Sequence, residues 1–169
     1  MAARTRLWFV LSGGSAGELG ALMRSLALRE LAAVVAAPTL DARACGEMLA
    51  TYARRELQIS KDLATSDVRA IRVLDELASE HPGAEIALCG PLAALQAALT
   101  TCLGLTSDSV PYIKLRAGGL YAFDWPAELP VSSAPVLVGA DLDWLPPWTP
   151  KQARNPYPGG PGAAGTARG

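Results

Sequence analysis

The sequence predicts an α/β protein with three layers, in which helices cover both faces of a mainly parallel β-sheet and an antiparallel hairpin closes the fold. Short apolar runs alternate with amphipathic segments of helical length, the pattern of strand–helix–strand units. The runs are apolar at consecutive positions, which is typical of strands buried on both faces. Turn-forming residues separate the segments, most clearly at Ser12-Gly13-Gly14 and His81-Pro82-Gly83.

The first strand and helix follow from one apolar run and one cap. Residues 7–11 are all apolar and end at a glycine-containing turn, so they are expected to form a buried strand. Ser15, with Glu18 three residues later, has the spacing of a capping box and predicts a helix over residues 16–30.

The second unit is expected to repeat this arrangement. Residues 31–37 are rich in Val and Ala and predict a strand that ends at Pro38. Thr39 or Asp41 then begins a helix that reaches residue 56. The pattern of residues 57–63 is ambiguous and allows a short extended stretch.

A third and a fourth helix enclose another strand. Ser66 is the expected cap of a helix over residues 67–80, which the His-Pro-Gly turn ends. Residues 85–89 predict a buried strand. Pro91 then opens a helix that runs to residue 103, because a proline in the first turn costs no hydrogen bond.

The C-terminal part divides into a hairpin and two further segments. Residues 112–115 and 120–125 alternate around a Gly-Gly pair and predict a β-hairpin. The expected α/β domain therefore covers residues 1–127. Residues 128–150 form an extended Pro- and Trp-rich segment, and the composition of residues 151–169 predicts a disordered tail.

Composition excludes several functional classes. Of the 169 residues, 50% are hydrophobic and 18% are charged, and the net charge is −1. Basic residues are scattered, so nucleic-acid binding is not expected. No apolar run reaches the roughly 20 residues of a membrane-spanning helix, and no signal peptide is recognised, so membrane insertion is not expected either.

The cysteines and the single histidine indicate a protein without cofactors. Cys45, Cys89 and Cys102 match no zinc or CxxC spacing, and His81 is alone, so we expect no metal site. Reduced thiols predict a cytoplasmic location.

The residues that could take part in catalysis or ligand binding lie at three expected strand ends. In open α/β sheets, ligands bind beyond the carboxyl ends of the strands. Leu11 and Ser12 end the first strand, Asp41 follows the second, and Cys89 ends the strand before the last helix.

The layout of these strand ends resembles the histidine phosphatase superfamily, also called phosphoglycerate-mutase-like, and within it the small phosphohistidine phosphatase branch. In that family a first strand ends in Arg-His-Gly, a second in Ser-Pro followed by Arg, and a later one in His-x-Pro-Leu after a His-Pro-Gly turn. The matching segments of this chain are residues 10–13, 37–42, 81–83 and 88–92, with residues 112–125 at the closing hairpin.

The resemblance implies that the catalytic residues have been lost. Ser12 stands where the family has its nucleophilic His, and Leu11 stands at the adjacent phosphate-binding Arg. Asp41 replaces the second Arg, and Cys89 replaces the second His. Phosphoryl transfer depends on cationic side chains, and Asp repels phosphate, so we expect no phosphate binding. The resemblance thus implies a catalytically inactive, protein-binding or scaffold subunit.

An alternative function is a phosphatase or other hydrolase with relocated chemistry. Ser12 or Cys89 would then be the nucleophile. However, neither has a histidine beside it in sequence, and Cys89 lacks the Arg of a C-x5-R loop, since Leu95 stands there. A turn serine and a buried cysteine are therefore the favoured interpretations.

Residues 140–150 suggest where a protein partner would bind. The segment combines Leu142, Trp144, Leu145 and Trp148 with three prolines that prevent a helix. Two interpretations remain open: a strap packed on the chain's own domain, or a docking motif for a partner's aromatic groove. The sequence does not name the partner, the pathway or the oligomeric state.

Overall fold

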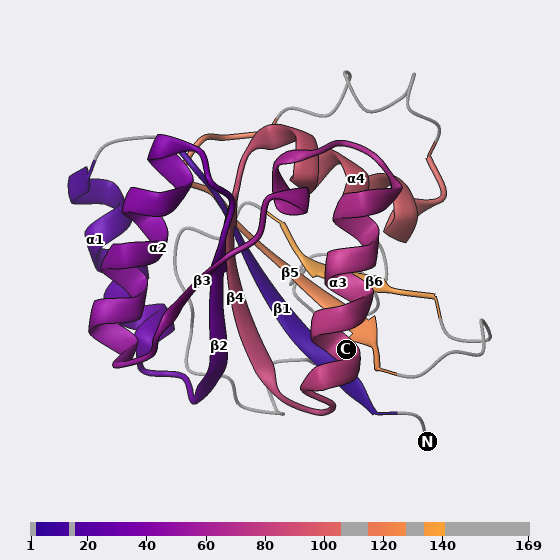
Figure 1. Cartoon of the computed structure of the whole chain (residues 1–169), viewed down its shortest axis with the longest axis horizontal. Helices are drawn as coiled ribbons and strands as arrows, with labels where there is room; N and C mark the ends of the chain where they lie inside the picture. The colour runs from indigo at the N-terminus through magenta and orange to yellow at the C-terminus, as the bar shows by residue number, and fades with distance from the viewer. Residues whose placement is uncertain (1–2, 14–15, 106–114, 128–133, 141–169) are drawn as a thin grey trace, which may run out of the picture.

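A computed structural model of the chain shows the predicted α/β class, with one six-stranded sheet between two pairs of helices (Figure 1). The structure describes residues 3–13, 16–105, 115–127 and 134–140. The strand order is β3-β2-β4-β1-β5-β6. The strands β1 (Arg4–Leu11), β2 (Leu31–Ala36), β3 (Leu57–Ile59) and β4 (Glu85–Gly90) are parallel.

The antiparallel part differs from the expected tight hairpin. Strand β5 (Leu120–Pro126) pairs antiparallel with β1, and β6 (Val136–Gly139) pairs antiparallel with β5. Both edges of β5 are therefore occupied around Phe123. The predicted hairpin partner, residues 112–114, lies outside the described residues. Strand β6 comes from the Pro-rich segment, so the sheet extends beyond the predicted domain end at residue 127.

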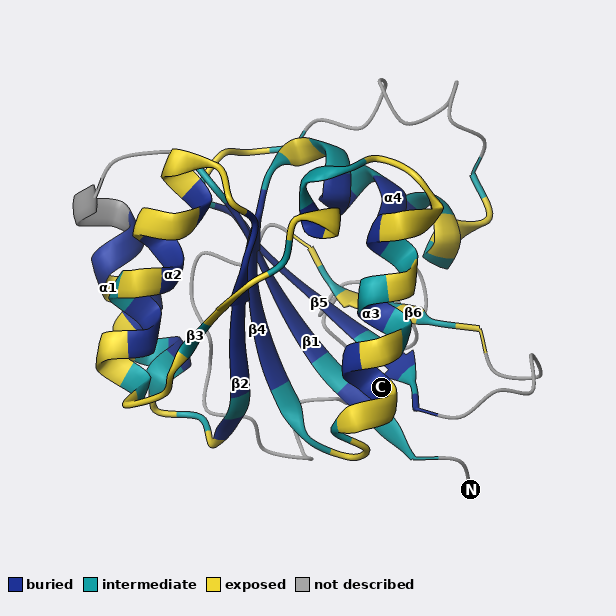
Figure 2. Ribbon diagram, viewed as in Figure 1, coloured by how far each residue is buried: buried dark blue, intermediate teal, exposed yellow. Residues whose placement is uncertain are grey.

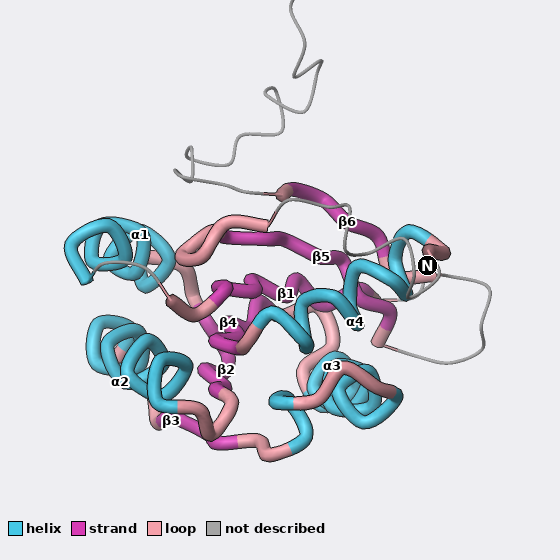
Figure 3. The backbone as a smooth tube through the Cα atoms, turned by 90° about the horizontal axis from the view of Figure 1, so that it is seen from above, coloured by secondary structure: helices cyan, strands magenta, loops and turns pink. Residues whose placement is uncertain are grey.

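Helices cover the two faces in pairs, as the view from above shows (Figure 3). Helices α1 (Ala16–Ala27) and α2 (Leu40–Ala53) lie on one face, and α3 (Val68–Glu80) and α4 (Leu92–Leu103) lie on the other. A short 3-10 helix, Asp62–Ala64, precedes α3. The two faces therefore form two hydrophobic cores.

The helix boundaries depart from the predicted ones for local reasons. Helix α1 ends three residues earlier than expected, and α2 ends where Arg54 takes a left-handed conformation with φ of 53°. The cap of α3 is Asp67 rather than Ser66, because the Asp67 carboxylate accepts a hydrogen bond of 2.8 Å from the Arg69 backbone N–H.

Burial follows the alternation of the strands. The central strands β1, β2 and β4 are almost entirely buried, whereas β3 at the edge and the outer surfaces of the helices are exposed (Figure 2). Residues of one strand alternate between the cores: Phe9 packs with α3 and α4, and Trp8 and Val10 pack with α1 and α2. No helix in the described part of the chain has the length and apolar character that spanning a bilayer requires.

Candidate functional site

The carboxyl ends of β1, β2 and β4 meet at one place, as the parallel arrangement predicts. The Ser12 backbone N–H donates to the Gly90 carbonyl at 2.9 Å, and the Ala37 N–H donates to the Cys89 carbonyl at 2.9 Å. Leu11 pairs with Gly90 in register. The backbones of three predicted site positions, Leu11, Ser12 and Cys89, are therefore close together.

Their side chains do not converge. Leu11 is 4% exposed and packs in the core beneath α3 and α4. Cys89 is 0% exposed and packs in the opposite core, beneath α1 and α2. Ser12 is half-buried just beyond the strand, and Asp41 is exposed in the first turn of α2. The side chains of Leu11 and Cys89 therefore lie on opposite faces of the sheet.

A turn from the C-terminal part of the chain closes over the end of β1. The Gly118 N–H donates to the Leu11 carbonyl at 2.8 Å, and the Leu11 N–H donates to the Gly119 carbonyl at 3.0 Å. Gly13 and Gly118 have φ of +108° and +77°, and a Cβ on Gly118 would lie 3.3 Å from the Gly13 carbonyl oxygen. Glycine is thus required for this close approach. These bonds occupy both backbone groups of Leu11.

Cys89 is a protonated thiol in this environment. A hydrogen bond with Cys45 and complete burial raise the pKa of Cys89 well above its ordinary value. Cys45 is itself buried against Met23, with 4.0 Å between the two sulfur atoms. Burial also raises the pKa of Cys102 to about 12. A thiol attacks as the thiolate, so neither Cys89 nor Cys102 is prepared as a nucleophile.

The single histidine lies at the opposite end of the sheet. The His81 carbonyl accepts a hydrogen bond of 2.8 Å from the Thr5 hydroxyl, and Thr5 lies near the start of β1. Six residues of extended strand separate Thr5 from Leu11, which corresponds to about 20 Å. His81 is therefore out of reach of Ser12 and Cys89 as a general base.

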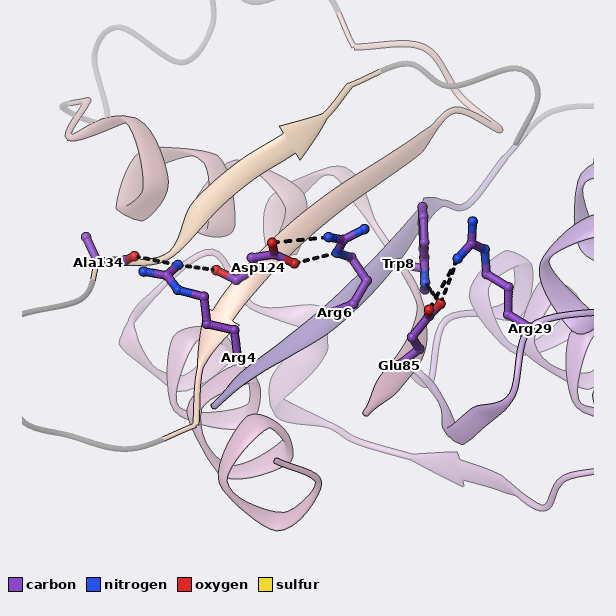
Figure 4. Close-up of polar contacts among 7 residues, drawn as sticks. All are labelled: Arg4, Arg6, Trp8, Arg29, Glu85, Asp124 and Ala134. Carbon is purple, nitrogen blue, oxygen red and sulfur yellow. Dashed lines mark hydrogen bonds and ion pairs between the residues drawn. The ribbon is translucent and has the colours of Figure 1, made fainter. Parts of the chain in front are cut away.

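An arginine cluster that the sequence did not reveal also lies at that opposite end (Figure 4). Arg6 forms a bidentate ion pair with Asp124, and Arg29 pairs with Glu85 at 3.1 Å. Glu85 also accepts a hydrogen bond of 2.7 Å from the Trp8 indole. The Arg29 guanidinium lies 4.3 Å from the centroid of the Trp8 ring. The only sign of this cluster in the sequence was that Arg6 and Trp8 are two residues apart on one strand, which places them on the same face of the sheet.

Two described arginines, Arg43 and Arg116, lie near the carboxyl ends of the strands. Arg43, on the first turns of α2, is exposed and lies 3.8 Å from Glu47. Arg116 is exposed in the turn that covers β1. Within the described residues, no group of three His, Cys, Asp or Glu side chains is arranged to hold a metal ion. The predicted partner-binding residues Leu142, Trp144, Leu145 and Trp148 lie outside the described residues.

Comparison with solved structures identifies the fold. Mycobacterial hydrolase 2 superposes with a TM-score of 0.69 at 13% identity, covering 83% of this chain and 91% of that chain. A mutant phosphoserine phosphatase from Entamoeba histolytica, in complex with phosphoserine, gives 0.62 at 10% identity, with coverage of 82% and 98%. Phosphoglycerate mutase from Plasmodium falciparum gives 0.61 at 12% identity, with coverage of 87% and 97%.

The chain has the phosphoglycerate-mutase-like fold. This finding confirms the fold predicted from the strand-end motifs, and at such low identity it concerns the fold alone. No protein-family model matches the sequence, and no curated protein matches it.

Proposed function

We propose that this protein is a catalytically inactive member of the histidine phosphatase superfamily, derived from the small phosphohistidine phosphatase branch, that acts by binding another protein. The proposal includes the cytoplasmic location expected from the cysteine pattern. Cys45, Cys89 and Cys102 are all free thiols in the structure, which supports a reducing compartment.

One observation carries the proposal: two of the four positions that would hold phosphate, Leu11 and Cys89, are buried in two separate cores. A phosphoryl-transfer site needs several donors directed at one group of oxygens. Here Leu11 and Cys89 are buried on opposite faces of the sheet, and neither offers a cation. Asp41 contributes a carboxylate, which opposes an anionic substrate. The strand ends that serve catalysis in this superfamily therefore carry packing residues in this chain.

Turnover measurements test the inactivity directly. We expect the full chain to hydrolyse neither p-nitrophenyl phosphate nor a phosphohistidine peptide faster than its own Ser12→Ala/Cys89→Ser variant does. An active phosphatase of the same fold, assayed in parallel, shows that the conditions permit turnover. Hydrolysis that disappears in the Ser12→Ala/Cys89→Ser variant would instead establish the relocated hydrolase.

Phosphate binding provides a second, independent test. Titration with inorganic phosphate, followed by calorimetry and by amide chemical shifts near Ser12 and Gly90, should show no saturable binding. A partner captured by the full chain and lost on truncation before Ala140 would assign recognition to residues 140–150. A partner retained by both would assign it to the α/β body.

A further inference from the structure

Strand β3 leaves one edge of the sheet open. Among the residues that the structure describes it pairs with β2 alone, and the order β3-β2-β4-β1-β5-β6 places it at the end of the sheet (Figures 1 and 3). The Ser60 N–H donates to the Ala36 carbonyl, so Ser60 and Gln58 direct their backbone groups toward β2. The alternation of a parallel ladder then directs the Ile59 N–H and carbonyl outward. An open edge of this kind can accept an additional strand.

A cleft of about 230 Å³ lies beside this edge, on the face that carries α3. Its apolar lining includes Val35 from β2 and Val73 and Leu77 from α3. On the other face α2 covers β3, because Leu57 packs into the core beneath α1 and α2. The open edge is therefore accessible from the side that carries the cleft.

The charged residues that line this cleft are all carboxylates. Asp62, Glu76 and Glu80 contribute to its walls, and no Lys or Arg does. Glu76 and Glu80 are one turn apart on α3 and exposed, and Asp62 lies opposite them on the 3-10 helix. None of the three carboxylates pairs within 4.0 Å of a described basic side chain. Of the three, Asp62 interacts electrostatically with Arg69, which pairs with Asp67, so the unpaired negative charge of the cleft rests mainly on Glu76 and Glu80.

We propose that the β3 edge and its acidic cleft bind an extended, basic segment of a partner protein, which adds to the sheet as a seventh strand. The backbone of the segment pairs with the outward groups of Ile59. A Lys or Arg side chain of the segment enters the cleft. Its methylene stem lies on Val73 and Leu77, and its cation reaches the carboxylates of Glu76 and Glu80. The inference rests on the proposed protein-binding function and names its surface.

The chemistry of the cleft favours this occupant over others. A phosphorylated or otherwise acidic ligand would be repelled by three carboxylates. The β3 strand of a second copy, Leu57–Ile59, itself contains no Lys or Arg, and the basic residues that flank it, Arg55 and Lys61, lie outside its three paired residues. A basic segment supplies both the missing strand and the missing positive charge.

Binding of a defined peptide to the full chain tests the proposal. The probe is a fluorescein-labelled peptide in which lysine alternates with valine, and its matched control alternates glutamate with valine. We expect saturable binding of the lysine peptide, none of the glutamate peptide, and weaker binding as NaCl rises from about 50 to about 500 mM. Amide shifts or hydrogen-exchange protection should appear at residues 57–60.

Variants distinguish binding in the cleft from attraction of the peptide to the protein's overall negative charge. Glu76→Gln/Glu80→Gln should weaken binding by about tenfold or more, whereas the matched pair Glu30→Gln/Glu47→Gln, exposed elsewhere, should leave it unchanged. Ile59→Pro removes the outward N–H without breaking the β2 ladder and should abolish binding, while Ile59→Val should preserve it.

Three results would overturn the proposal. They are absence of binding by the lysine peptide, equal weakening by both glutamine pairs, and a concentration-dependent dimer that Ile59→Pro disperses, which would assign the edge to a second copy. Phosphatase assays on the same samples test the proposed inactivity independently of the proposed peptide binding. Turnover would refute the inactivity without affecting peptide binding, and loss of peptide binding would leave the inactivity intact.

Discussion

Glu85→Ala should be the most informative change to the stability of the fold, because one carboxylate satisfies two otherwise isolated groups. Glu85 accepts a hydrogen bond of 2.7 Å from the Trp8 indole and pairs with Arg29 at 3.1 Å (Figure 4). The Trp8 residue is 2% exposed, so its N–H has little access to a replacement water. Truncation of Glu85 therefore leaves a buried donor and a largely buried cation without their acceptor.

The magnitude follows from these two losses. An unsatisfied buried N–H costs about 1–3 kcal/mol. The partly exposed ion pair with Arg29 contributes up to about 1 kcal/mol more. Glu85→Ala should thus lower the free energy of unfolding by about 1–4 kcal/mol, and for a chain of this size the middle of that range corresponds to a fall in Tm of about 8 °C. Glu85→Gln keeps an acceptor for Trp8 and should cost only about 1 kcal/mol.

Guanidinium unfolding followed by far-ultraviolet circular dichroism measures these differences without relying on tryptophan emission. A double-mutant cycle with Trp8→Phe isolates the hydrogen bond, because Phe has no N–H to leave unsatisfied. The cycle should give a coupling free energy of about 1–2 kcal/mol. A cost of Glu85→Ala below about 0.5 kcal/mol, or full additivity with Trp8→Phe, would refute the assignment of Glu85 as the acceptor that stabilises this end of the sheet.

Three further changes test other parts of the structure. Gly46→Ala would place a Cβ 2.8 Å from a β2 side chain and should destabilise the protein by about 1–3 kcal/mol, whereas Gly20→Ala meets only an arginine tip at 3.9 Å and should be neutral or stabilising on thermal unfolding. In the native protein Cys89 should resist iodoacetamide at pH 8, and Cys102, with a pKa of about 12, should react about 1000-fold more slowly than an ordinary thiol, as mass spectrometry with an unfolded control will show. Asp67→Ala should lower the Tm at neutral pH. Because the hydrogen bonds from Arg69 depress the Asp67 pKa to about 2, that difference should persist down to about pH 4 and disappear as the pH falls toward 2.

The central part of the fold could be predicted because each of its strands contains an uninterrupted apolar run. Strands β1, β2 and β4 each have four or more consecutive apolar residues, and only burial on both faces satisfies that pattern. Strand β6 carries no comparable signal. Its four residues alternate between exposed and half-buried and follow Pro135, and they form a strand because β5 offers a free edge. Pairing of that kind is decided by tertiary structure rather than by local preference.

For the candidate site, the sequence predicted which backbone segments lie together but not where their side chains point. The rule that parallel strands end at one edge correctly placed Ser12 next to Gly90. Alternate residues of a strand face opposite sides of the sheet, so the core in which Leu11 or Cys89 lies depends on which alternate set it belongs to. Moving either strand by one residue in the sheet would place its side chain in the other core. No motif in a single sequence specifies which face of the sheet a given strand residue occupies. That Leu11 and Cys89 lie on opposite faces therefore became evident only in the structure.

The acidic cleft escaped sequence analysis for a related reason. Its lining comes from β2, β3 and α3, and it exists because β3 is the outermost strand, a property of strand order that no local pattern reveals. Arg6 and Arg29, which could have held an anion, are neutralised by Asp124 and Glu85 at the amino ends of the strands. The carboxylates of Glu76 and Glu80 lie beside the open edge without an ion-pair partner among the described residues. Phosphoserine phosphatase and phosphoglycerate mutase share this fold. In this chain the edge strand β3 lies beside carboxylates, and the binding proposed there would use none of the strand-end residues Leu11, Ser12 and Cys89.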